Sequence, residues 1–443
     1  MKRWFDRRAT PRAILIASWV VFALYAYPGY MTTASIDELV DSRIGQLTDW
    51  HSPMMTEVWR VVGHLVSGPA GMLALQSVLT LAGVYTLLRR VTTERAAAIL
   101  AGAILVFPPI LAMSAVLVPE SQLAAFLVAG AAAVASPRHA VRGLGIIALV
   151  IAAGMAAGGT VAVLPLIALG CAQLRRPRWQ RYVIAVAVWV VIASAAALID
   201  RFLVDSETRR NQVQLAIDDT VGVLRYAGPI DDAQLRETLG AAPVVLAEGL
   251  QARAKDIYGH ADRYQYGDRR LFDPPASALA RDALENARWS LLRTYPGAYL
   301  HHRWHQFVRV LGLSRGKDWT PVYTSFAELD GEQLSVRHDA RHAPVQKLLI
   351  HGERWLGGTF LFHPYWYFLL ALVLLPVAAM RRQRDVLAVL GSGILYELVQ
   401  MFVTDAPACA SSHWMILTTI VATTFLIARR YGLAGSDATV AGG

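Results

Sequence analysis

Apolar runs of a length that suits a lipid bilayer recur along most of the chain. They cover Ala13 to Tyr27, Ala70 to Leu88, Ala96 to Val118, Ser121 to Ala135, Tyr182 to Ile199, Tyr365 to Met380, Val386 to Val403 and His413 to Ala428. A helix needs about 20 such residues to cross a hydrocarbon core of about 30 Å. The pattern therefore predicts an all-α polytopic membrane protein.

One further run, from Leu144 to Leu174, is too long for a single span. A helix of that length would measure about 46 Å at 1.5 Å per residue. Gly154, Gly158, Gly159 and Pro165 interrupt the run. We therefore predict two short helices that enter the membrane and return to the same side. The total becomes about nine to ten transmembrane or re-entrant helices.

The basic residues between the runs orient the chain. Six clusters, at residues 2–12, 89–95, 138–142, 175–181, 381–384 and 429–430, contain 19 of the 21 basic residues outside the segment 201–364. If the N-terminus is cytoplasmic, all six clusters fall on the cytoplasmic side, as the positive-inside rule expects. The segment 201–364 then lies outside, which means the periplasm in a bacterium.

The segment 201–364 has the composition of a soluble unit, with 21 basic and 20 acidic residues. Helices are predicted from Asp231, where acids stand in the first turn, from about Ala276 to Arg293, and from Pro296 to Leu311. The polar segment from Gly312 to Ala343 is predicted to be a loop, because it has no sustained strand pattern. We expect a mainly helical periplasmic domain.

These boundaries predict four parts of the chain. They are an N-terminal transmembrane domain at 1–200 with its first outer loop at 28–53, the periplasmic domain at 201–364, C-terminal transmembrane helices at 365–430 and a cytoplasmic tail at 431–443. The predicted location is the bacterial inner membrane, crossed several times.

Composition excludes several classes of protein. Hydrophobic residues make up 55% of the chain and charged residues 17%, whereas soluble domains carry about a quarter charged residues. The net charge of +9 lies mostly in the loops between the apolar runs, so nucleic-acid binding is not needed to explain it. Two cysteines, Cys171 and Cys409, are too few for a disulfide framework or a cysteine zinc site.

The first outer loop gathers the chain's most suggestive polar residues. Asp37, Glu38, Asp41 and Asp49 lie within a short stretch, and His51 follows. On a helix, positions four residues apart share a face, and carboxylates held together gain affinity for protons or cations. Such a loop suits a general base or a divalent-metal site, although a solvated acidic loop has the same composition.

A wider pattern surrounds these acids. It consists of Tyr27-Pro28-Gly29 after the first apolar run, then Asp37, Gly45 and Asp49-Trp50-His51-Ser52-Pro53. In this pattern the sequence resembles the GT-C superfamily of polyprenyl-phosphate-sugar-dependent integral membrane glycosyltransferases, in its bacterial branch. Ser52 stands where that branch usually has proline. The resemblance implies that the first outer loop is catalytic, with Asp37 as general base and Glu38 beside it.

Glu120 is the second candidate catalytic residue, because it lies at the outer end of two apolar runs. The resemblance implies an acidic residue in this second outer loop. An acid in the first turn of a helix, stabilised by the helix dipole, is the alternative. Asp37 and Glu120 are also candidate metal ligands, for which Mg²⁺ or Mn²⁺ suit oxygen donors better than zinc.

Other polar residues are candidates for binding the donor phosphate or the substrate: Asp49, His51, Arg60, Arg303 and His413. A guanidinium can bind phosphate through two hydrogen bonds. His413-Trp414 occupies the place of an Arg-Tyr pair that many relatives have at the start of the last span. His413 could donate a hydrogen bond or lie at the membrane interface.

The resemblance implies direct, inverting transfer of a sugar from a polyprenyl phosphate to a hydroxyl of a cell-envelope glycan or lipid. The expected partners are that donor, the acceptor and the bilayer, with no nucleic acid. A transporter or flippase for lipid-linked glycans is the main alternative, favoured by the interrupted run from Leu144 to Leu174. A membrane-anchored binding protein would need fewer apolar runs, and a head-group transferase would need a nucleophile and zinc ligands.

Overall fold

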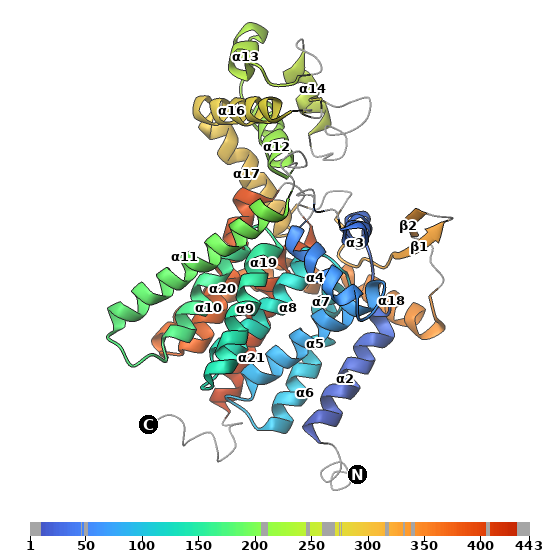
Figure 1. The fold of residues 1–443 in the computed structure, drawn as a ribbon, viewed down its shortest axis with the longest axis vertical. Helices are drawn as coiled ribbons and strands as arrows, with labels where there is room; N and C mark the ends of the chain where they lie inside the picture. Colours follow the sequence, from blue (N-terminus) through green and yellow to red (C-terminus); the bar gives the residue numbers. More distant parts are fainter. Residues whose placement is uncertain are drawn as a thin grey trace.

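In the computed structural model, a bundle of apolar helices carries a smaller helical unit at one end (Figure 1). The structure describes residues 10–45, 47, 52–204, 211–244, 249–258, 271–273, 275, 277–314, 319–330, 333–337, 342–404 and 408–431. The helix that starts the bundle, α2, begins at the end opposite the helical unit, and the last helix, α21, finishes there.

The bundle consists of apolar helices of unequal length. They are α2 (Pro11–Ala26), α5 (Pro69–Leu88), α6 (Glu94–Leu105), α7 (Pro108–Ser114), α8 (Pro119–Val134), α9 (His139–Met155), α10 (Gly159–Cys171), α11 (Arg178–Leu203), α19 (Pro364–Met380), α20 (Arg384–Val403) and α21 (His413–Arg430).

By length and hydropathy, four described helical stretches can each cross a membrane: Pro69–Leu88, Arg178–Ile199, Arg384–Val403 and Cys409–Arg430. The bent pair α6 and α7 would make a fifth, and five shorter apolar helices complete the bundle. The prediction of an all-α polytopic membrane protein is confirmed.

Two of the long apolar runs are broken into separate helices. The run predicted as one span from Ala96 to Val118 is broken, because α6 and α7 meet at an angle of 69°. Two consecutive prolines, Pro108 and Pro109, begin α7, and proline cannot continue a helix because it lacks the N–H. The run from Leu144 to Leu174 forms two helices, as predicted, with Gly158 between them in a left-handed conformation.

Hydrogen bonds show that α9 begins, and α10 ends, at the same end of the bundle. The side chain of Gln173, after α10, donates to the carbonyl of Ala135, before α9, over 2.8 Å. Arg142 on α9 reaches the Gln173 side chain at 3.0 Å. Arg90, from the end of α5, donates to the same Ala135 carbonyl and lies 3.5 Å from Asp385.

The helical unit at the end of the bundle, which we call the outer unit after its predicted location, has a hydrophobic core of its own. It comprises α12 (Asn211–Tyr226), α13 (Asp232–Leu239), α14 (Leu250–Ile257), α16 (Ala278–Thr294) and α17 (Pro296–Val310). Two predicted helix starts are confirmed, because Asp231 is the N-cap of α13 and Pro296 is the first residue of α17. The last residues of α17 reach back to the bundle, where Ser412 donates to the carbonyl of Val310.

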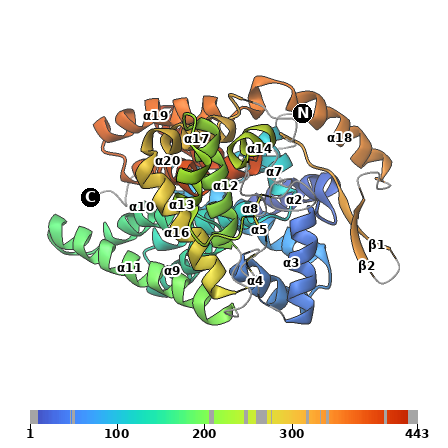
Figure 2. The same ribbon diagram turned by 90° about the horizontal axis from the view of Figure 1, so that it is seen from above.

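A short hairpin corrects the prediction of loop between Gly312 and Ala343. The strands β1 (Phe326–Asp330) and β2 (Gln333–Arg337) pair antiparallel, Phe326 opposite Arg337. The hairpin lies beside α3 (Thr33–Ile44) and α18 (Pro344–Gly357) when the molecule is seen from above (Figure 2). The remaining elements at this end are α4 (Pro53–Gly63) and the short 3-10 turns η1 (Phe360–Phe362) and η2 (Cys409–Ser412).

Candidate functional site

The two outer loops that carry the predicted acids are joined by main-chain hydrogen bonds. The Tyr30 N–H donates to the carbonyl of Ala115, and the Leu117 N–H donates to the carbonyl of Tyr30, both over 2.9 Å. Tyr30 and Val116 form a parallel bridge. The chain leaving α2 is therefore fixed alongside the segment between α7 and α8.

The start of α3 reinforces this junction. Thr32 and Ser35 form a capping box, in which each side chain accepts from the backbone N–H of the other. The Ser35 hydroxyl also donates to the carbonyl of Leu117. Because Ser35 is two residues before Asp37 and Leu117 is three residues before Glu120, the bond brings the two acidic segments together.

Two glutamine side chains of the bundle hold the segment between α7 and α8 in place. Gln76 on α5 donates to the carbonyls of Ser114 and Val116, at 2.7 and 3.3 Å. Gln122 on α8 donates to the Gln76 side chain over 2.8 Å. These polar residues interrupt otherwise apolar helices, where a buried polar group is expensive without a partner. Their position in the apolar runs was the signal that sequence reasoning overlooked.

Four carboxylates meet at this outer end of the bundle. Asp37 is exposed, Asp41 and Glu120 are half-buried, and Glu38 is buried with 1% of its surface exposed. Asp37 and Glu38 are adjacent on α3, Asp41 follows one turn later, and Glu120 comes from the first turn of α8. The predicted residues Asp37, Glu38 and Glu120 therefore belong to one electrostatic cluster.

Glu38 is the unusual member of the cluster. Burial raises the pKa of its carboxyl well above the ordinary value of 4.5, and the negative charges of Glu120, Asp41 and Asp37 raise it further. The backbone N–H of Ser52 lies near enough to counter part of the rise. It does not reach hydrogen-bond geometry, because neither carboxylate oxygen has a hydrogen-bond partner among the described residues. Burial of this kind favours the protonated form of the acid.

We predict that Glu38 makes the protein less stable as pH rises. Since its folded pKa is raised, the folded protein binds a proton that the unfolded chain releases above pH 4.5, and the free energy of unfolding falls from that pH upward. Glu38→Gln should match the wild type near pH 4.5 and melt at a higher temperature at pH 8. Melting curves of the purified protein in detergent at both pH values test this, with Glu237→Gln, at an exposed glutamate of α13, as control. Parallel pH profiles for Glu38→Gln and wild type would contradict the prediction.

The described residues do not form a ready-made metal site. Within that part of the chain, no group of three or more His, Cys, Asp or Glu side chains has an arrangement suited to a metal ion. Asp37 and Glu120 therefore do not by themselves make up a ligand set for Mg²⁺ or Mn²⁺, which take six or more oxygen donors. Asp49, the other acid of this loop, and His51 lie outside the described residues.

The first outer loop ends on α4, and Ser52 explains how. Its side chain caps the helix by accepting from the Met55 N–H, and its hydroxyl donates to the Gly154 carbonyl at the end of α9 over 3.1 Å. A proline could make neither bond. Arg60, on the exposed side of α4, pairs with Glu57 at 2.6 Å, and the arginine end of this pair lies in solvent.

Arg303 lies in a buried ionic network between the outer unit and the bundle. Its guanidinium is fully buried, 2.6 Å from an Asp219 oxygen, and donates to the Thr404 carbonyl at the end of α20 over 2.6 Å. Burial raises the pKa of the Asp219 carboxyl, and the charges of Arg303 and Arg288 counter the rise. In this arrangement Arg303 faces carboxylates, and a phosphate would have to displace Asp219.

His413 is also inside the protein. Only 1% of its surface is exposed, and its Nε2 lies 3.3 Å from the Ser114 hydroxyl. Trp414 beside it is equally buried and donates to the Ser392 hydroxyl over 2.9 Å. These two residues therefore connect α21 to α7 and α20, next to the segment that carries Glu120.

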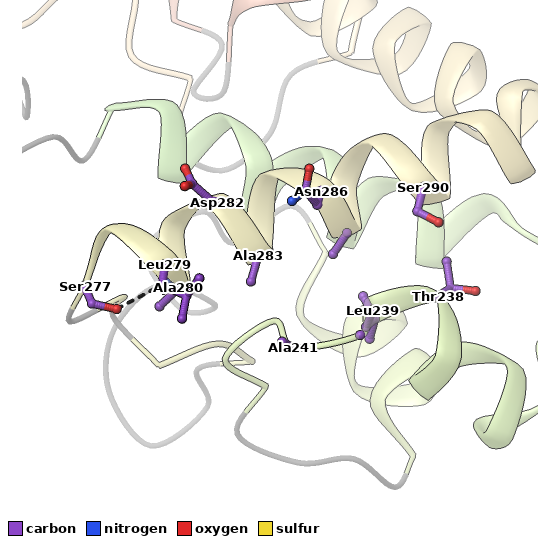
Figure 3. A pocket seen from close by; sticks show the side chains of 12 residues that line it. Thr238, Leu239, Ala241, Ser277, Leu279, Ala280, Asp282, Ala283, Asn286 and Ser290 are labelled. Carbon is purple, nitrogen blue, oxygen red and sulfur yellow. Dashed lines mark hydrogen bonds between the residues drawn. The ribbon is translucent and has the colours of Figure 1, made fainter.

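A separate cavity of about 590 Å³ opens at the far tip of the outer unit. Figure 3 shows it between α16 and the end of α13, lined by small side chains such as Ala280 and Ala283 with Asn286 and Ser290 at its edge. None of the residues predicted for catalysis or substrate binding lines this cavity.

Comparisons with known proteins add one likeness. No protein-family profile matches the chain, and no curated protein sequence matches it. Among solved structures, it is similar to the crystal structure of ArnT from Cupriavidus metallidurans bound to undecaprenyl phosphate. The two chains are 13% identical, the match covers 93% of this chain and 77% of the other, and the TM-score is 0.35. Superposition at this level does not establish a common fold. A function for this chain therefore has to be argued from the residues and contacts of the carboxylate cluster and its surroundings.

Proposed function

We propose that the protein is a glycosyltransferase of the bacterial inner membrane. It moves a sugar from a polyprenyl-phosphate donor to a hydroxyl of a cell-envelope glycan or lipid at the periplasmic face. The observation that carries the proposal is the meeting of Asp37, Glu38 and Asp41 with Glu120 at the outer end of an apolar bundle. The resemblance of the first outer loop to GT-C enzymes supports the same reaction.

Asp37 is the proposed general base. It is the exposed carboxylate of the cluster, so an acceptor hydroxyl can approach it. As the acceptor oxygen attacks the anomeric carbon, its proton passes to Asp37, and the bond from that carbon to the phosphate oxygen breaks. The anomeric carbon is inverted, and the polyprenyl phosphate leaves with the bonding electrons.

The neighbouring acids have different proposed tasks. Burial favours the protonated form of Glu38, and in that form it can donate a hydrogen bond to a sugar or phosphate oxygen without adding negative charge. The charge that develops on the leaving phosphate needs a positive partner. Arg60 is the proposed donor of that charge, because its side chain is half exposed and its ion pair among the described residues is with Glu57.

Arg303 and His413 remain proposals for contact with the substrate, through an opening of the structure that frees their side chains. The metal is likewise a proposal: if Mg²⁺ or Mn²⁺ binds here, Asp37 and Glu120 would supply oxygen ligands, and the ion would stabilise charge on the phosphate. No part of the proton transfer to Asp37 requires it.

A reconstitution experiment tests the proposed transfer. The purified protein is placed in vesicles with a radiolabelled undecaprenyl-phosphate sugar and an extract of cell-envelope acceptors. We expect label to move into a covalent product and undecaprenyl phosphate to accumulate in equal amount. Label that crosses the bilayer while it stays on the original lipid would overturn the proposal and favour a flippase.

The flippase alternative has its own supporting observation. The α9–α10 break meets α20, where the Gln400 side chain donates to the Ala157 carbonyl over 3.2 Å. Glu397, one turn away on α20, is fully buried and accepts from Ser412. Broken helices and buried acids at membrane depth are features of transporters, so the vesicle experiment measures both outcomes on the same sample.

A further inference from the structure

A group of rings and arginines lies on the outer unit, apart from the carboxylate cluster. Tyr226, at the end of α12, stacks on His301 of α17 with ring centres 4.2 Å apart. Tyr258, after α14, meets Tyr226 edge-on at 5.5 Å, and His305 lies 5.9 Å from Tyr258. We call these four residues, together with Arg225 and Arg309, the aromatic–basic surface.

Buried groups hold this surface in shape. The Tyr258 hydroxyl is 2.9 Å from Nδ1 of His302, whose Nε2 is 3.1 Å from an Asp218 oxygen. Gln306 donates to the same carboxylate. His302 fits against α12 because position 222 is glycine, where a Cβ would lie only 2.2 Å from the imidazole ring. A chain of hydrogen bonds therefore fixes the orientation of Tyr258 from inside the protein.

The arginines of the surface differ from the other central arginines of the outer unit. Arg288 and Arg303 each pair with Asp219 at 2.7 and 2.6 Å. Among the described residues, neither Arg225 nor Arg309 has a carboxylate within salt-bridge distance, and Arg309 makes only a long contact of 3.5 Å with the Gln306 side chain. Burial lowers the pKa of His305, and the positive charges of Arg309 and Arg225 lie close enough to lower it further. The surface therefore carries positive charge that the described residues do not neutralise.

We propose that the aromatic–basic surface binds an anionic saccharide, the acceptor glycan of the proposed transferase. Flat rings pack against the C–H faces of sugars, and a guanidinium binds a carboxylate or phosphate through paired hydrogen bonds. Phosphate and carboxylate groups share this chemistry. The identification of the ligand as the acceptor rests on the proposed function, whereas binding of an anionic saccharide does not.

The position of the surface suits an acceptor that must reach the membrane. His301 and His305 lie on α17, the helix whose Arg303 contacts the end of α20 and whose last residues contact η2. A polymer held by α17 can therefore extend along the helix toward the outer end of the bundle, where the carboxylates lie. The surface would hold the acceptor chain while its terminal hydroxyl approaches Asp37.

Binding experiments on the full-length protein in phosphatidylcholine nanodiscs test the proposal. The probes are maltotriose, trigalacturonic acid and maltose 1-phosphate, which are neutral, carboxylated and phosphorylated. We expect saturable binding of one or both anionic sugars, weakened by salt, and at least about tenfold weaker binding of maltotriose, the equivalent of about 1.4 kcal/mol. The charged probe that binds better identifies the anionic group.

Variants locate the binding. Arg225→Gln with Arg309→Gln should abolish the preference for anionic sugars, and Tyr226→Ala should weaken binding of all three probes, whereas Tyr226→Phe should keep it. Arg293→Gln, an exposed arginine on α16, is the matched control and should bind as the wild type does. Unchanged anionic binding in the double variant, or no binding by wild-type protein of intact melting temperature, would overturn the proposal.

The assay is independent of sugar transfer. Asp37→Asn should bind the anionic probe normally even if it is inactive. Binding without any transferase activity would leave the surface as a saccharide site and remove its role as acceptor site. Repeating the titration in phosphatidylglycerol nanodiscs tests the bilayer as the rival partner. Loss of saccharide binding in favour of the lipid surface would overturn the proposal.

Discussion

Asp37→Asn is expected to reduce glycosyl transfer by about 100- to 10,000-fold, the usual contribution of a general base. Asparagine keeps the size of the side chain and cannot accept the acceptor proton. Because Asp37 is exposed, the substitution should leave the melting temperature unchanged. The measurement is turnover of labelled donor lipid in vesicles, with surface glycan in a deletion strain as a second readout.

Two matched variants make this result specific. Asp41→Asn removes one negative charge from the same face of α3, four residues away, and should cost far less turnover if Asp37 takes the proton. Glu38→Gln should stay close to wild type, because glutamine resembles the protonated acid. Wild-type turnover by Asp37→Asn, at equal protein level, would remove Asp37 from the mechanism. Inactive Asp41→Asn with active Asp37→Asn would move the base one turn along the helix.

Asp219→Asn is expected to cost about 3–5 kcal/mol of stability, the range for breaking a buried ion pair from one side. Within the described part of the chain, the fully buried Arg303 would keep one acidic neighbour, Asp218 at 3.8 Å. The measurement is thermal unfolding in detergent, followed by tryptophan fluorescence. Since Arg303 also contacts Thr404, the change should loosen the attachment of α17 to α20.

A second substitution distinguishes whether the lost stability comes from an unpaired charge or from lost packing. Adding Arg303→Gln to Asp219→Asn removes the uncompensated cation and should restore part of the lost stability. Asp256→Asn, an exposed acid on α14, should have no effect. If Asp219→Asn unfolds at the wild-type temperature, the network does not hold the outer unit to the bundle, and Arg303 becomes available for the phosphate contact proposed from its sequence.

The apolar runs predicted the bundle well because burial in a membrane depends on composition that the sequence displays directly. The ends of α5, α11, α20 and α21 lie within a few residues of the predicted spans. The break between α6 and α7 was missed, although Pro108-Pro109 marks it, because hydropathy alone does not register a missing N–H. The β1–β2 hairpin was missed because two short strands of mixed polarity give a weak pattern.

The candidate site was predictable in part. The acids of the first outer loop and Glu120 were identified one by one, and the resemblance grouped them. Their meeting depends on backbone hydrogen bonds such as those of Tyr30, which leave no trace in residue type. For Arg303 the sequence was misleading. It shows an arginine in a polar segment, but it does not show that Asp218 and Asp219, about 85 positions earlier, surround that arginine in the fold.

The way Tyr30 pairs with Val116 has a consequence for how this protein can vary. The junction is made by carbonyls and N–H groups, which every residue except proline supplies. Replacements at 115–117 that keep the buried apolar volume of these side chains should therefore leave the junction intact. Inserting or deleting one residue would instead slip the register and carry the glutamate of the second loop away from its neighbours. Spacing, more than identity, is what mutational drift must preserve here.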